Sequence, residues 1–136
     1  MEFNKAMEIA AAGMAAQRTR LRVVSENLAN ADSTAQVPGG DPYRRKVVTF
    51  RSALDRELGV ETVKVAGIKP APGEFQRHFD PAHPAADKDG YVLMPNVNPL
   101  IEMMDMREAQ RSYQANLSVI DAAKAMISRT LEILQA

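Results

Sequence analysis

The sequence contains no cysteine and no tryptophan, and aromatic residues make up only 5% of it. Without cysteine, the chain has no disulfide, no thiol nucleophile and no zinc site built on thiolates. No uninterrupted apolar run approaches the roughly 18 residues that a membrane-spanning helix needs. We therefore expect no direct insertion into a membrane.

Charge of one sign is not in excess either. Lysine and arginine together number 17, as do aspartate and glutamate, so nothing attracts the whole surface to nucleic acid. The alanine-rich run 9–16 is preceded by Glu2 and Glu8 rather than by a basic segment, and we expect no cleaved signal peptide.

The residues that interrupt helices are confined to the middle of the sequence. All eight prolines lie from Pro38 to Pro99, and six of the seven glycines lie from Gly39 to Gly90. Both ends are thus free to be helical. The pattern divides the chain into an N-terminal helical segment 1–32, a Pro/Gly-rich segment 33–98 and a C-terminal helical segment 99–136.

Both ends carry an apolar stripe with alternating steps of four and three residues, which is typical of a helix that packs along one side. The candidate packing residues are Phe3, Met7, Met14, Leu21, Leu28, Tyr113, Leu117, Ile120, Ile127, Leu131 and Leu134. Helices of roughly 27 and 35 residues would be about 40 and 50 Å long. Because a small middle segment cannot cover them, their stripes should meet each other or another subunit.

The middle segment is rich in strand formers at Tyr43–Phe50, Val60–Val65 and Tyr91–Met94, with turn residues between these stretches. Two or three strands make only a small sheet. The predicted fold is therefore mainly α, with long N- and C-terminal helices packed as a coiled coil and a small β-containing middle segment.

The middle segment also contains the only two histidines, His78 and His83. Their spacing matches no metal motif, and both are expected in proline-flanked loop. Asp87-Lys88-Asp89-Gly90 resembles part of a calcium loop but lacks its other acidic ligands, so a turn before Tyr91 is favoured. The sequence has no phosphate loop and no nucleophile elbow. We predict no catalytic, cofactor-binding or metal-binding residue, and no enzyme.

The end of the first helix carries the most specific pattern, Val23-Val24-Ser25-Glu26-Asn27-Leu28-Ala29-Asn30-Ala31-Asp32-Ser33. It resembles the signature of flagellar basal-body rod proteins, in which an apolar pair precedes Asn-Leu-Ala-Asn. Asn27 and Asn30 can bond backbone groups and tolerate left-handed conformations, which suits a helix end. They join the stripe residues as candidate interface residues.

Further segments extend the resemblance to nearly the whole chain, with proteins of the proximal rod as the best match: Pro38–Lys46, Pro95–Asn98, Glu102-Met103 and Arg111–Asn116. The resemblance implies a subunit exported through the flagellar type III apparatus without a cleaved signal. In the periplasm it would polymerise with copies of itself and other rod proteins into a hollow, torque-transmitting shaft. Phe3 and Met7 resemble an export-gate element, although they also fit plain helix packing.

Two other hypotheses stay open from the residues alone. The first is a soluble coiled-coil adaptor of small fixed stoichiometry, in which the two helices bind within one monomer or a small oligomer. The second is a metal-assisted hydrolase that uses His78, His83 and Asp80.

Overall fold

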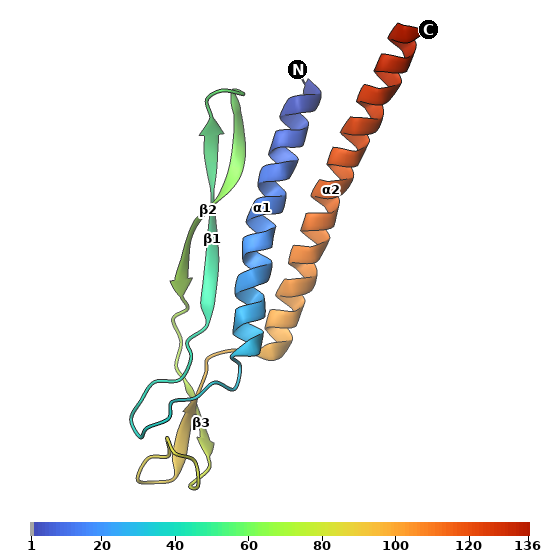
Figure 1. Ribbon diagram of the computed structural model, residues 1–136. Coiled ribbons are helices and arrows are strands. Elements are labelled where there is room, and N and C mark those ends of the chain that lie inside the picture. Colours follow the sequence, from blue (N-terminus) through green and yellow to red (C-terminus); the bar gives the residue numbers. More distant parts are fainter. Residues whose placement is uncertain (1) are drawn as a thin grey trace.

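The structure is a computed structural model that describes residues 2–136, so Met1 of the predicted segment 1–32 lies outside the described residues. Two long helices, α1 (Glu2–Ala29) and α2 (Pro99–Gln135), enclose a segment with four strands. The helices run side by side in opposite directions, with both chain ends at the same end of the pair (Figure 1). The predicted long terminal helices with a small β-containing middle are confirmed.

Side-chain hydrogen bonds define the helix ends that face the middle segment. At the start of α2, Asn98 accepts a hydrogen bond from the Leu100 amide at 3.1 Å, and Pro99 occupies the first turn. At the end of α1, the Asn30 side chain donates to the Glu26 carbonyl at 2.8 Å. No non-glycine residue among residues 2–136 has a positive φ, so Asn30 ends the helix by hydrogen bonding and not by a left-handed conformation.

A long antiparallel hairpin of β1 (Lys46–Asp55) and β2 (Val60–Pro70) follows α1, with a bulge between Thr49 and Phe50. Both strands are longer than the predicted ranges. Their backbones approach α1 and not α2, which places α1 between the hairpin and α2 (Figure 1).

A second hairpin, β3 (Gln76–Phe79) with β4 (Tyr91–Met94), forms a separate sheet at the end away from the chain termini (Figure 1). The range of β4 is as predicted, whereas β3 was missed and His78 was wrongly expected in loop. Gln76, Arg77 and His78 are weak strand formers. Pairing with β4, including the edge-on contact of Phe79 with Tyr91 at 5.3 Å, outweighs that weak preference.

The core is small and centres on α1. Helix α1 buries Ala10, Gly13, Ala16, Val23, Val24 and Asn27, whereas α2 buries only Glu102, Ala109 and Ala123. The larger apolar residues of the predicted stripes lie beside this core and not in it. Packing of the two helices against each other is observed, while its description as a coiled coil stays a prediction.

Candidate functional site

The contact between α1 and α2 is made by small and polar side chains at seven-residue spacing. On α2, Glu102, Ala109 and Ala123 are buried at multiples of seven residues, and Asn116 occupies the same line. On α1, Gly13 lies against Asn116, because a Cβ atom at Gly13 would be only 2.8 Å from the Asn116 amide nitrogen. The lack of a side chain at Gly13 therefore leaves the space that Asn116 occupies.

Asn27 is the centre of the polar end of this contact, and only 1% of its surface is exposed. Its amide nitrogen donates to the Lys46 carbonyl at 2.8 Å and to Glu102 at 3.3 Å. Its amide oxygen accepts from the Lys46 amide at 3.0 Å and from the Tyr43 hydroxyl at 2.7 Å. One side chain thus joins the end of α1 to the start of β1 and to α2.

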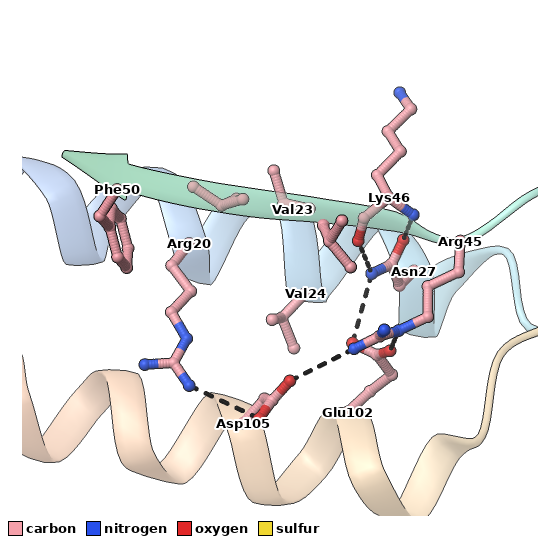
Figure 2. A pocket seen from close by; sticks show the side chains of 11 residues that line it. Arg20, Val23, Val24, Asn27, Arg45, Lys46, Phe50, Glu102 and Asp105 are labelled. Carbon is pink, nitrogen blue, oxygen red and sulfur yellow. Dashed lines mark hydrogen bonds and ion pairs between the residues drawn. The ribbon is translucent and has the colours of Figure 1, made fainter. Parts of the chain in front are cut away.

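Charged residues extend this network, which we call the junction: Arg20, Asn27, Tyr43, Arg45, Lys46, Glu102 and Asp105. Figure 2 shows these residues apart from Tyr43. Glu102 is fully buried and accepts from the Nε atom of Arg45. Asp105 lies 3.4 Å from Arg45 and 3.5 Å from Arg20. Every buried side-chain nitrogen or oxygen in residues 2–136 has a hydrogen-bond partner, so the buried charge is compensated.

The junction borders a hollow of about 370 Å³ between α1, β1 and the start of α2. Val23 and Val24 line it from α1, and Phe50 lines it from β1 (Figure 2). The charged groups beside it are already paired with one another. This arrangement joins structural elements, and it presents no free acid, base or nucleophile for catalysis.

The pKa of Tyr43 is raised, first by burial and then by the carboxylates of Glu26 and Glu102. Each of these effects disfavours the phenolate. The neutral hydroxyl is the form that can donate to Asn27, so the environment maintains the protonation state that this hydrogen bond requires.

The predicted interface residues differ in burial. Asn27 alone is fully buried; the half-buried members are Phe3, Met7, Met14, Leu21, Leu28, Asn30, Tyr113, Leu117, Ile120 and Ile127, and the exposed members are Leu131 and Leu134. At the end where the chain begins, Phe3, Ile127, Leu131 and Leu134 line an apolar hollow of about 420 Å³. We call these four residues the open end.

A second apolar line on α2 consists of residues that were not among the predicted packing residues. Val119, Met126 and Ile133 are spaced by seven residues, and 45%, 53% and 74% of their respective surfaces are exposed. Seven residues are nearly two helical turns, so the three side chains share one face. Their spacing was a usable signal for a separate face.

The junction charges were the functional feature that sequence reasoning missed. Arg45 and Glu102 were noticed only as parts of the family resemblance. The available signal was Glu102 itself, which stands seven residues before Ala109 on the line that faces α1. A carboxylate at such a position needs a cationic partner if it is buried.

The two histidines lie in different settings. His78 is exposed in β3. The His83 ring nitrogens contact the Thr34 hydroxyl and the Ala85 amide, both at 3.0 Å. Within residues 2–136, no group of three or more His, Cys, Asp or Glu side chains is placed to hold a metal ion, so the hydrolase hypothesis finds no ligand set.

Asp87 forms the expected turn before β4. Its carboxylate accepts from the amides of Asp89 and Tyr91, each at 2.9 Å. These amides and the nearby Arg77 lower the pKa of the Asp87 carboxyl, with the Tyr91 amide as the largest cause. The carboxylate stabilises a turn and is not arranged as a calcium ligand.

Neither helix of the described chain combines the length and apolar character that crossing a bilayer requires.

Comparison with known proteins gives the same family at both ends of the chain. A family model described as "Flagella basal body rod protein" matches residues 7–35, and one described as "Flagellar basal body rod FlgEFG protein C-terminal" matches residues 88–133. The flagellar basal-body rod protein FlgC of Agrobacterium fabrum is 56% identical over 134 residues, covering 98% of this chain and 96% of the relative. The FlgC of Salmonella typhimurium is 43% identical over 137 residues, covering 99% and 100%.

Proposed function

Because the chain belongs to the flagellar basal-body rod protein family, we propose that it polymerises through α1 and α2 into the hollow, torque-transmitting shaft of the proximal rod. Within this family it is a structural subunit of the flagellar basal-body rod and not an enzyme. Its proposed partners are copies of itself and other rod proteins in the periplasm. The proposed route there is the flagellar type III export apparatus, without a cleaved signal.

The observation that carries this proposal is the apolar surface that α2 leaves uncovered. Only three residues of this 37-residue helix are buried. Leu100, Met104, Ile133 and Leu134 are each more than 60% exposed. Apolar side chains gathered along one element in this way mark a protein interaction site, and a helix of this length offers neighbouring helices a long seam.

We propose that the two apolar lines of α2 have different partners. One line includes Leu131 and Leu134, which belong to the open end together with Phe3 of α1. The line of Val119, Met126 and Ile133 is exposed at seven-residue spacing, which suits coiled-coil packing against a helix of a neighbouring subunit. The half-buried stripe residues of α1 would be covered fully by the same assembly.

The role of Phe3 and Met7 belongs to the proposal as well. Both side chains are half-buried in the folded chain, and Phe3 lies beside Leu131 of α2. In an unfolded chain during export they would be accessible to the export gate, and packing would follow after folding. The same two residues can therefore serve both steps at different times.

The test is a motility complementation series with aspartate placed on different faces of α2. Leu131→Asp and Leu117→Asp put a charge into the apolar seam and should abolish rod assembly and swimming. Ala125→Asp is the matched control, because Ala125 is exposed and shares a face with Asp121 and Glu132. Ala125→Asp and His78→Ala should both swim normally. Normal swimming of both leucine variants would contradict the proposal.

Sedimentation of the purified protein separates this function from the adaptor hypothesis. A rod subunit should be a monomer that forms long polymers under assembling conditions. A discrete dimer or trimer at every concentration would favour an adaptor of fixed stoichiometry.

A further inference from the structure

The small residues of the helix contact do not by themselves fix the register of α2 against α1, that is, which residues of the two helices lie opposite each other. Gly13 faces Asn116 in the structure. A slide of α2 by one heptad would bring Gly13 opposite Ala109 or Ala123, both of which are buried on the same line. Alanine is smaller than asparagine, so shape does not oppose either slide. Apolar stripes with a seven-residue repeat also match again after such a slide.

The junction distinguishes between these registers because its partners are polar and specific. Arg45 and Asn27 both bond Glu102, whose surface is fully buried. A slide of seven residues moves Glu102 by about 10 Å along the helix axis, which is beyond the reach of both partners. A buried carboxylate without its partners is strongly disfavoured.

The backbone of Arg45 is held in place by hydrogen bonds, so its side chain can bind that carboxylate at one position only. Its amide donates to the Asn96 side chain at 2.7 Å, and its carbonyl accepts from the Ala71 amide at 2.7 Å. The next residue, Lys46, is bonded to Asn27 through both its backbone amide and its backbone carbonyl. The Arg45 backbone is therefore tied to the ends of β2 and β4 and to α1.

We infer that Arg45 and Glu102 are positioning residues that set the register of α2 against α1 and β1. A polar pair inside a helix interface is known to specify register. The consequence for assembly rests on the proposed function: identical copies can build one regular polymer only if each presents the same surface, and the offset of α2 determines that surface.

The experiment measures the register in the dilute monomer with two spin labels. The chain has no cysteine, so Arg22→Cys and Ala122→Cys give two unique labelling sites, both exposed. The two sites lie at different heights along the helix pair, and a slide changes their separation directly. The otherwise unaltered protein should give one narrow distance, and Arg45→Met with Glu102→Met should add a population displaced by about 10 Å.

Two further variants keep the result interpretable. Glu26→Gln with Lys46→Met removes an exposed ion pair of 3.5 Å beside the junction and should leave the single distance unchanged. Glu102→Leu removes the buried charge while Arg45, which is 25% exposed, still lies beside Asp105. It should fold with normal helix content and show the second distance.

Three results would overturn the inference. A single unchanged distance in the Arg45/Glu102 variants would mean that the fit of Gly13 against Asn116 sets the register. A broad distance in the unaltered protein would mean that the junction sets none. Loss of helix content in both Glu102 variants would make the junction a requirement for folding and not a choice between registers. The labels report the register in monomers and do not depend on assembly. If the unaltered protein shows a single register but does not form rods, the proposed function would be contradicted and the register inference would stand.

Discussion

The two ends of the helix pair are built on opposite principles. At the junction, Asn27 and Glu102 are almost completely inaccessible to water, and their polar atoms are paired within the chain. At the open end, Leu131 and Leu134 are 52% and 76% exposed beside a hollow lined almost wholly by apolar groups. One end is complete within the monomer, whereas the other still has apolar surface to bury.

This difference indicates how stability is distributed along the molecule. Hydrogen bonds to buried partners hold the junction, and their loss would leave several polar groups unpaired at once. The open end has few buried contacts, which is typical of regions that open locally at low free energy. A subunit with one fixed end and one loose end can keep its shape and still complete its folding against neighbours.

The largest expected effect is at Asn27. Asn27→Ala would leave the Lys46 amide and carbonyl, the Tyr43 hydroxyl and one oxygen of Glu102 without this partner. We expect a loss of about 3 kcal/mol in the free energy of unfolding, measured by urea denaturation of the monomer.

Asn30→Ala is the matched control within the same four-residue motif. Within residues 2–136, the side chain of Asn30 bonds only the Glu26 carbonyl and the Ser33 hydroxyl, at the partly exposed end of α1. Its replacement should lower the free energy of unfolding by about 1 kcal/mol or less. Equal effects at the two asparagines would mean that the junction is no more stabilising than an ordinary helix end.

The second effect is at Gly13, midway between the two ends. Gly13→Leu would place a large side chain where even a Cβ atom meets Asn116 at 2.8 Å. Forcing the helices apart should destabilise the monomer by about 2 kcal/mol, measured as a shift in the urea midpoint. Ala15→Leu adds the same side chain at an exposed position of α1, and a comparable loss there would show that helix separation is not the cause.

The third effect separates assembly from stability. Met126→Asp replaces a residue that is 53% exposed on the outward line of α2. The free energy of unfolding of the monomer should change by no more than about 0.5 kcal/mol, while swimming and rod assembly are lost. A variant that is both stable and motile would remove Met126 and its line from the proposed interface.

The smallest effect concerns the alkaline limit of stability at the junction. Since the pKa of Tyr43 is raised in the folded protein above its ordinary value of 10.0, the unfolded chain releases this proton at lower pH. The protonated Tyr43 hydroxyl therefore contributes to the free energy of unfolding. This contribution is complete below pH 10 and is lost as the pH rises toward the folded pKa. The free energy of unfolding then falls by at most about 1.4 kcal/mol per pH unit. Tyr43→Phe should flatten urea-midpoint profiles recorded between pH 9 and 11, and an unchanged slope would contradict this.

Sequence periodicity predicted the helices, because long apolar stripes with no proline beyond the first turn and with Gly13 as their single glycine leave few alternatives. Strand β4 was predicted by its β-forming residues, whereas β3 depends on pairing with a partner 12 or more residues away in the chain, which composition does not encode. The large apolar residues of the predicted stripes are half-buried or exposed in the monomer, so their role as an interface stays a prediction. The small residues Gly13, Ala109 and Ala123 are buried instead, because small residues let two helices approach.

The partner of Glu102 in the junction could not be identified from the sequence, for a different reason. Arg45 and Glu102 are separated by 57 residues, and nothing local in either segment indicates that the two meet. Asn27 was identified through the family signature and through its suitability for a helix end. Its four hydrogen bonds to three other residues follow only from the way the middle segment returns to α1.

We expect the monomer to be held together at the junction, and its open end to be completed only by assembly. Amide hydrogen exchange along the chain of the dilute monomer tests it directly. We expect slow exchange over residues 20–29 and 99–109, and fast exchange over residues 2–9 and 127–135 that becomes slow in the assembled rod. Strong protection along the whole of both helices in the monomer would contradict the claim, because the helices would then already satisfy each other, as in an adaptor.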